Sequence, residues 1–282
     1  MNSTTTSEEI KQLVKDKYSL IAMQSKEANA SSCCGVGGCA TVDYSIMADD
    51  YTHLKGYTPD ADLGLGCGLP TEFALIKEGD TVVDLGSGAG NDCFVARSIT
   101  GPSGKVIGID FTERMIQKAR ENADKLKFNN VEFRQGDIEQ MPLGGGVADV
   151  VVSNCVMNLV PNKELAFAET FRILKPGGHF SVSDIVLVGK LPLGLQKSAE
   201  MYAGCVAGAI QESDYLGIIQ RVGFTNIKIQ KRKVIVLPTE ITNQYLNQEE
   251  MKAFSAGDTG IFSITVYAEK PAACCAPGCC DK

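Results

Sequence analysis

The stretch VVDLGSGAGND, Val82–Asp92, decides the fold that the sequence predicts. An apolar run ends at Asp84, and glycines at positions 86, 88 and 90 then predict a tight turn that leads into a helix. Glycine has no Cβ, so such a turn lets the backbone approach a ligand closely. A strand, a glycine-rich turn and a helix in this order are typical of nucleotide-binding α/β proteins.

A second acidic residue strengthens this interpretation. Asp110 ends the next apolar run, GKVIGID, where a carboxylate is well placed to accept hydrogen bonds from a ribose diol. One alternative is a plain tight turn with a solvated aspartate. Another is a dinucleotide-dependent dehydrogenase, but the loop lacks the G-x-G-x-x-G spacing that brings a helix N-terminus to a pyrophosphate.

Predicted strands and helices alternate along the chain on both sides of this motif. Strands that alternate with helices of about 10–15 residues predict a parallel, doubly wound sheet. The predicted helices are residues 7–30, 90–99, 112–126, 163–174 and 213–223, with a helix-rich insertion from 191 to about 210. The predicted strands are residues 80–86, 104–110, 131–137, 148–154, 177–187, 225–236 and 260–270.

Composition narrows the class of protein. The chain has 282 residues, of which 44% are hydrophobic and 22% charged, and its net charge is −7. An acidic chain is a poor partner for nucleic acid, which binds mainly through Lys and Arg. The first residues lack the pattern of a secretory signal, and no apolar run reaches the roughly 20 residues that span a bilayer. We therefore expect a cytoplasmic protein that binds neither nucleic acid nor a membrane.

Eleven cysteines are unusual for such a protein. In the reducing cytosol they indicate metal binding or redox chemistry rather than structural disulfides, and the presence of only two histidines disfavours mixed Cys/His zinc sites. Cys93 is expected to be a core residue. The cysteines form an early group (Cys33, Cys34, Cys39), a late group (Cys274, Cys275, Cys279, Cys280) and a scattered set (Cys67, Cys93, Cys155, Cys205).

The chain resembles the class I S-adenosylmethionine-dependent methyltransferases over roughly residues 65–190. VVDLGSGAG, the acid of GID, Gly136–Asp137 and LKPGGHF carry the resemblance. It implies a seven-stranded, mostly parallel Rossmann-like sheet with an N-terminal helical segment, a helical substrate-binding insertion and S-adenosylmethionine as cofactor. The glycine loop would contact the methionine part, Asp110 the ribose, and Met115 with Asp137–Ile138 the adenine. The alternative for Met115 is a core residue of its helix, and the two roles are compatible. The cofactor-binding residues implied are Asp84, Gly86, Ser87, Gly88, Gly90, Asn91, Asp110, Met115, Asp137, Ile138 and Asn154.

Three of the scattered cysteines lie in segments that can overhang one active site of this fold. Cys155 follows the fourth predicted strand in SNCVMNLVP, Cys67 precedes the first in LGLGCGLP, and Cys205 lies in YAGCVAGAI after the fifth. Three thiolates together would bind a soft ion. The alternative for each cysteine alone is a small buried hydrophobic residue.

The motifs DLGLGCGLP, SNCVMNLVP and GCVAGAI are similar to those of the arsenite methyltransferases. This resemblance implies that Cys155 and Cys205 hold As(III), that Cys67 joins them, and that Cys33 or Cys34 forms a disulfide with Cys67 during turnover. The substrate would be an As(III)–thiol complex in a detoxification reaction. Glutathione or a thioredoxin-type partner would serve as the external thiol reductant.

Two other functions remain open at this point. A methyltransferase of an organic thiol, quinone or amine would leave the three cysteines unexplained, and a non-catalytic metalloid sensor or buffer would leave the glycine loop and Asp110 unexplained. The predicted organisation has an N-terminal helix and Cys-rich loop (1–60) and a cofactor-binding domain (61–190). The arsenite-binding insertion with the final strands (191–270) and a flexible Cys-rich tail (271–282) follow.

Overall fold

The protein is seen in a computed structural model that describes residues 6–24, 26, 29, 49–190, 208–235, 247–249, 252 and 259–272. The strands are β1 (Thr81–Leu85), β2 (Lys105–Asp110), β3 (Val131–Gln135), β4 (Ala148–Asn154), β5 (Leu174–Val188), β6 (Thr225–Val234) and β7 (Gly260–Glu269). The helices are α1 (Ser7–Ile21), α3 (Pro70–Phe73), α4 (Asn91–Thr100), α5 (Glu113–Leu126), α6 (Lys163–Ile173) and α9 (Glu212–Val222), with short 3-10 turns η2 (Pro59–Ala61) and η3 (Met157–Leu159).

These strands form one seven-stranded sheet in the order β3-β2-β1-β4-β5-β7-β6. Strands β1 to β5 pair in parallel. Strand β7 is antiparallel to both of its neighbours, β5 and β6. The predicted seven-stranded, mostly parallel sheet is therefore confirmed, while the helix-rich insertion predicted from residue 191 lies mainly outside the described residues.

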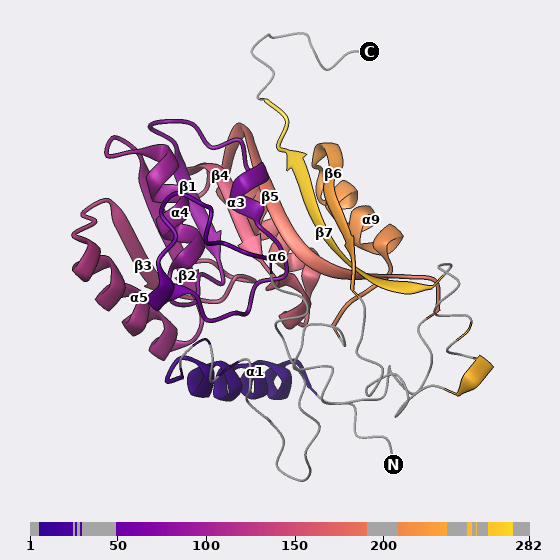
Figure 1. Ribbon diagram of the computed structural model, residues 1–282. Helices are drawn as coiled ribbons and strands as arrows, with labels where there is room; N and C mark the ends of the chain where they lie inside the picture. The colour runs from indigo at the N-terminus through magenta and orange to yellow at the C-terminus, as the bar shows by residue number, and fades with distance from the viewer. Residues whose placement is uncertain are drawn as a thin grey trace, which may run out of the picture.

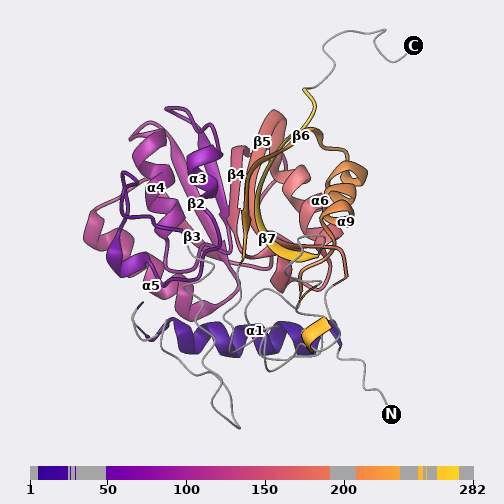
Figure 2. The same cartoon turned by 45° about the vertical axis from the view of Figure 1, so that its right-hand side comes forward.

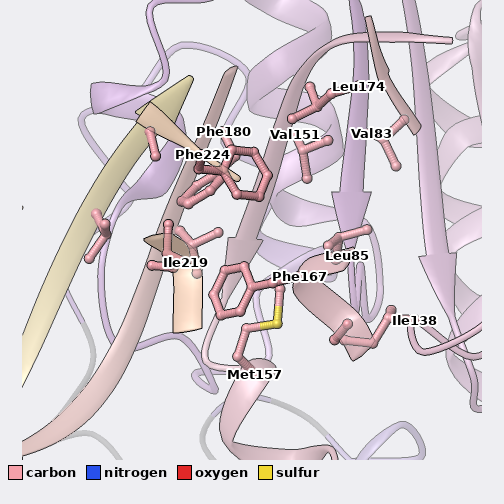
Figure 3. Close-up of a cluster of buried hydrophobic side chains, with 14 of the residues drawn as sticks. Val83, Leu85, Ile138, Val151, Met157, Phe167, Leu174, Phe180, Ile219 and Phe224 are labelled. Carbon is pink, nitrogen blue, oxygen red and sulfur yellow. The ribbon is translucent and has the colours of Figure 1, made fainter. Parts of the chain in front are cut away.

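Helices cover both faces of the sheet, with α4 and α5 on one side and α6 and α9 on the other (Figures 1 and 2). Successive side chains of a strand point to opposite sides of the sheet, so the central strands β1, β2 and β4, which have helices on both sides, are buried on both faces. Val82 packs into the core under α4 and α5, and Val83 packs into the core under α6 and α9. Figure 3 shows the latter core, where Phe167 of α6 lies near Met157 and below Phe180. Each fully buried side chain of this kind contributes about 1.5–3 kcal/mol to folding.

The N-terminal helix is shorter than predicted. Thr6 and Glu9 form a capping box, because each side chain accepts a hydrogen bond from the backbone N–H of the other residue. The helix ends at Ile21 and not near residue 30, because the N–H of Met23 bonds to the carbonyl of Leu20 and closes a turn. Among the described residues, no helix has the length and apolar character that crossing a membrane requires.

The parallel strands β1, β2 and β4 end at the same level of the sheet. Leu85 pairs with Ile109 on one side and with Ser153 on the other. Their carboxyl ends therefore share one edge, which is where ligands bind in open α/β sheets. Helix α1 runs across the same end of the molecule (Figures 1 and 2). The fold thus places a helix from the start of the chain over the edge at which the predicted cofactor residues meet.

Candidate active site

A cavity opens at this edge of the sheet, and most of the predicted cofactor residues line it. It encloses about 1090 Å³, including the part that is open to solvent, which is enough for a nucleoside-sized ligand. Gly90, the N-cap of α4, is the one predicted cofactor residue that does not line it. The predicted residues on its wall are Asp84, Gly86, Ser87, Gly88, Asn91, Asp110, Met115, Asp137, Ile138 and Asn154.

Asp110 fastens the glycine loop to the end of β2. One carboxylate oxygen accepts the N–H of Gly88 at 3.0 Å, and the other accepts the N–H of Thr112 at 2.8 Å. The N–H of Ser87 also bonds to the carbonyl of Ile109. Burial raises the pKa of Asp110, while the backbone N–H groups oppose this shift by stabilising the charged form. Asp110 therefore holds the conformation of the glycine loop, and the same hydrogen bonds fix the position of its carboxylate.

Three acidic side chains, Asp84, Asp92 and Asp110, gather on the wall of the cavity. Among the described residues, none of the three forms a salt bridge with a basic side chain. Burial raises the pKa of Asp84 well above its ordinary value and that of Asp92 to about 6. A cationic ligand that entered the cavity would stabilise these carboxylates in their charged form.

Two buried polar atoms on the cavity wall have no partner within the protein. The hydroxyl oxygen of Ser87 and the side-chain carbonyl oxygen of Asn91 lack a hydrogen bond. Buried polar groups in folded proteins are nearly always bonded, so unpaired atoms beside a cavity indicate a ligand. With the acidic wall, they fit a nucleoside that carries a cationic centre, which describes S-adenosylmethionine.

The sequence did not predict a contribution of α1 to this cavity. Lys11, Val14 and Tyr18 line it from that helix. The ammonium of Lys11 lies 2.6 Å from the carboxylate of Asp137 and also pairs with Glu139. The spacing of positions 11, 14 and 18 is that of one helix face, but the sequence does not show which strand end the face covers.

The chain leaves the sheet at Cys155, as the sequence predicted. Its φ of +61° is in the left-handed region, which is uncommon for a residue with a Cβ and typical of functional sites. Its N–H bonds to the carbonyl of Ser183 on the neighbouring strand β5 at 2.8 Å. This turn directs the Cys155 side chain to the edge of the cavity, which it lines.

The Sγ atom of Cys155 meets that of Cys67 there. The two residues form a disulfide, with Cα atoms 5.7 Å apart. Two of the three predicted arsenic ligands are therefore adjacent, although 88 positions separate them in the chain. Cys33, Cys34 and Cys205 lie outside the described residues, so the predicted pairing of Cys33 or Cys34 with Cys67 and the third ligand stay predictions. Cys93 is buried and donates to Asp84, in agreement with the expected core position.

Asp184 is a further site residue that sequence reasoning missed. One of its carboxylate oxygens lies within 4.8 Å of both the Cys67 and Cys155 sulfurs. It is fully buried, accepts hydrogen bonds from Asn158 and from the N–H of Ile185, and burial raises its pKa to about 7. The sequence did contain a signal for Asp184, since it is the single carboxylate in the apolar strand SVSDIVLV. Acidic residues are rarely buried without a partner or a function, so one in a strand that is buried on both faces indicates a functional role.

Comparison with known proteins identifies the family. Residues 76–234 match the model of a methyltransferase domain. The chain is 37% identical over 278 residues to the arsenite methyltransferase of Halobacterium salinarum, covering 94% of this chain and 68% of that one. It is 30% identical over 259 residues to the arsenite methyltransferase of Aquipseudomonas alcaligenes, covering 89% and 70%. The crystal structure of an arsenic(III) S-adenosylmethionine methyltransferase from Chlamydomonas reinhardtii superposes with a TM-score of 0.62 at 33% identity, covering 73% of this chain and 68% of that one. The chain therefore belongs to the arsenite methyltransferase family of S-adenosylmethionine-dependent methyltransferases.

Proposed function

We propose that this protein methylates trivalent arsenic that is held by its own cysteine thiolates. The observation that carries the proposal is the meeting of Cys67 and Cys155 at the edge of a cavity that fits S-adenosylmethionine. A methyltransferase of an organic substrate needs neither thiol. A thiol-based buffer needs neither the glycine loop nor Asp110.

S-adenosylmethionine, when bound, supplies an electrophilic methyl group. On the protein side, Asp110 and the glycine loop would hold the ribose and the methionine part, and Asp137 with Ile138 would border the adenine. The unpaired oxygens of Ser87 and Asn91 would accept hydrogen bonds from the ligand. Holding both reactants in alignment is the main contribution of the protein, and positioning of this kind can lower a barrier by several kcal/mol, up to about 7–11.

Cys67, Cys155 and Cys205 would bind the arsenic as thiolates, which are the ligands that soft elements prefer. Arsenic(III) with three thiolate ligands is pyramidal and keeps a lone pair, which serves as the nucleophile. No general base from the protein is then required. In this organisation residues 61–190 bind the cofactor, and residues 191–270 contribute Cys205.

Methyl transfer to the lone pair raises the arsenic from the trivalent to the pentavalent state. Two thiolates of the protein would return two electrons by closing a disulfide, and the arsenic would become trivalent again. We assign this step to Cys67 with Cys33 or Cys34. Glutathione or a thioredoxin-type protein would reopen the disulfide in the cytoplasm, where such reductants keep thiols reduced.

The test is to incubate the protein with arsenite, S-adenosylmethionine and a thiol reductant, and to measure methylated arsenic against a reaction without cofactor. Cys155→Ser and Cys205→Ser should abolish the product from both arsenite and monomethylated trivalent arsenic. Cys67→Ser should affect arsenite more strongly, because the methylated substrate has one fewer position for a thiolate. Cys93→Ser is the matched control and should keep its activity. Cys93 lies outside the thiol site, and a serine there can still donate a hydrogen bond to Asp84.

Three results would contradict the proposal. Wild-type activity of the Cys155→Ser variant would rule out the proposed thiol site. Cofactor binding without methylation of arsenic by the wild type would favour an organic substrate. Arsenite binding without any binding of the cofactor would favour a metalloid buffer.

A further inference from the structure

We propose that Asn154 and Ser263 are positioning residues that clamp the backbone of Cys67 and thereby hold its thiol beside that of Cys155. The purpose of this clamp, a thiol pair ready for arsenic, rests on the proposed function. The clamp itself rests on hydrogen bonds and burial, and its test needs neither arsenic nor cofactor.

Asn154 holds one side of the Cys67 segment. Its side-chain oxygen accepts the N–H of Cys67 at 3.0 Å and the N–H of Gly68 at 3.3 Å. Its amide group donates to the carbonyl of Gly68 at 2.8 Å and to the hydroxyl of Tyr51 at 2.5 Å. The same amide group also lies 3.4 Å from a carboxylate oxygen of Asp92. An asparagine side chain has two donor hydrogens and an oxygen with two lone pairs, so these contacts leave none of its polar groups unpaired. The side chain of Asn154 is thus engaged by the cysteine segment, although it lines the cofactor cavity.

Ser263 holds the other side from β7. Its hydroxyl donates to the carbonyl of Cys67 at 2.5 Å, and both residues are buried. The peptide groups on either side of the Cys67 Cα are therefore bonded to two different strands, β4 and β7. With both peptide groups held, the thiol can move only by rotation of its own side chain.

The glycines that flank Cys67 fit this clamp. A Cβ on residue 66 would lie 2.5 Å from the amide nitrogen of Asn154, and a Cβ on residue 68 would lie 2.5 Å from the hydroxyl of Ser183. Both distances are shorter than a Cβ tolerates. Glycine at position 66 therefore lets the Cys67 segment come within hydrogen-bond reach of Asn154, and glycine at position 68 lets it pack against Ser183 of β5.

The partner thiol is fixed by the same strand. Cys155 directly follows Asn154, and its N–H is bonded to Ser183 of β5. The residue that clamps Cys67 and the residue that carries the second thiol are thus neighbours in the chain. A displacement of the end of β4 would therefore move both thiols in the same direction.

This arrangement has a measurable consequence for thiol–disulfide exchange. Two reduced cysteines and oxidised dithiothreitol give the Cys67–Cys155 disulfide and reduced dithiothreitol, with two electrons and two protons passing to the reagent. The equilibrium constant of this exchange depends on how closely the protein holds the two thiols. Releasing the Cys67 backbone lowers their effective concentration and makes the disulfide easier to reduce.

The experiment uses the full chain without arsenic or cofactor, equilibrated in dithiothreitol redox buffers. Free thiols are alkylated, and the fraction of Cys67–Cys155 crosslinked peptide is measured by mass spectrometry. We expect Asn154→Ala to lower the equilibrium constant at least tenfold, which is about 30 mV for a two-electron couple. Ser263→Ala should lower it about threefold, because it releases one side only.

Ser153→Ala is the matched control. Ser153 is fully buried in the same strand as Asn154, and its hydroxyl donates to the carbonyl of Leu85 at 3.0 Å and not to the Cys67 segment. This variant should lose stability in urea denaturation and keep the equilibrium constant within twofold of the wild type. A purely structural role of Asn154 would produce the same pattern as this control.

If Asn154→Ala and Ser263→Ala both leave the equilibrium constant within twofold of the wild type, the clamp is wrong. If Asn154→Ala does not fold, Ser263→Ala decides alone by the same criterion. Failure of the proposed function is a separate result, because it would appear as absence of arsenic methylation by the wild-type protein. The redox equilibrium of the thiol pair does not depend on that activity.

Discussion

The side chain of Val156 occupies the space that a Cβ on Gly86 would need. An ideal Cβ at position 86 would lie 2.3 Å from a methyl carbon of Val156, and the φ of Gly86 is +66°. Gly86 belongs to the glycine loop that lines the cavity proposed for the cofactor, and Val156 follows Cys155 in the chain. The nucleotide half and the thiol half of the site are therefore in direct contact through these two residues.

Gly86→Ala should damage both halves of the site. The new methyl group would displace Val156 and the left-handed turn at Cys155, in addition to the cost of about 1 kcal/mol for a non-glycine residue at positive φ. We expect a total loss of roughly 3 kcal/mol in the free energy of unfolding, as for other substitutions that overpack a core. Urea denaturation measures this loss.

Gly88→Ala is the control for that experiment. Gly88 has a φ of +52°, but a Cβ there would meet no atom of the described residues within 4 Å. Its cost in unfolding free energy should be limited to the backbone contribution, about 1 kcal/mol. Equal losses for the two variants would show that the contact with Val156 contributes nothing to stability.

Asp110→Ala should weaken the binding of S-adenosylmethionine and leave arsenite binding nearly intact. The substitution removes the proposed ribose acceptor and the two bonds that hold Gly88 and Thr112. Hydrogen bonds to a charged group contribute about 1.5–3 kcal/mol, which corresponds to roughly 10- to 100-fold in affinity. Calorimetry measures the affinity, and Asp80→Ala, which loses a bond to the N–H of Lys77 at the far end of β1, is the control. Unchanged cofactor affinity in Asp110→Ala would exclude this placement of the ribose.

Lys11→Met should loosen α1 over the cavity. Lys11 pairs with Asp137 and Glu139 and lines the cavity with Val14 and Tyr18. Exposed or half-exposed ion pairs contribute about 0.2–1 kcal/mol each, so we expect cofactor to dissociate roughly 2- to 10-fold faster in a stopped-flow displacement experiment.

A second lysine provides the comparison for α1. Lys125 of α5 pairs with Asp60 of η2, and their side chains are 64% and 68% exposed. Lys125→Met removes the same charge and should leave the dissociation rate unchanged. The role assigned to α1 fails if the two variants release cofactor at the same rate.

Asp92→Asn should change how stability depends on pH in the absence of ligand. Burial raises the pKa of Asp92 to about 6, from an ordinary value of 3.8, against hydrogen bonds from Tyr51, Asn154 and Thr71. Between these two values the folded protein keeps a proton that the unfolded chain releases. The unfolding free energy of the wild type therefore falls as pH rises through this window, by up to about 1.4 kcal/mol per pH unit.

The asparagine variant cannot titrate at this position. Its unfolding free energy relative to the wild type should therefore increase from about pH 4 to about pH 6 and then level off. Urea denaturation across this range gives the comparison. A constant difference between the two proteins over the whole range would contradict the raised pKa of Asp92.

The sequence by itself determined the elements of the sheet and most of the residues that line the cavity proposed for the cofactor. Strand β1, the glycine loop and α4 follow one another directly, so turn chemistry and hydrophobic periodicity are enough to predict them. Asp110 was found in the same way, because the carboxyl ends of parallel strands meet at one edge. These patterns are local in the sequence, and the parallel arrangement of the strands places them at the same edge of the sheet.

Only the tertiary structure decided how the thiol half is built. The contact of Cys67 with Cys155, the clamp by Asn154 and Ser263, and the nearby carboxylate of Asp184 join segments that lie far apart in the chain. No periodicity encodes such contacts, since they depend on the register of β4, β5 and β7 and on the path of the loop before β1. Helix α1 is a similar case: the sequence predicted a helix to residue 30, but hydrogen bonds of the turn after Ile21 end it there. Sequence patterns specify which residues can form an element, whereas side-chain partners across a sheet are set by packing and by the need to pair every buried polar group.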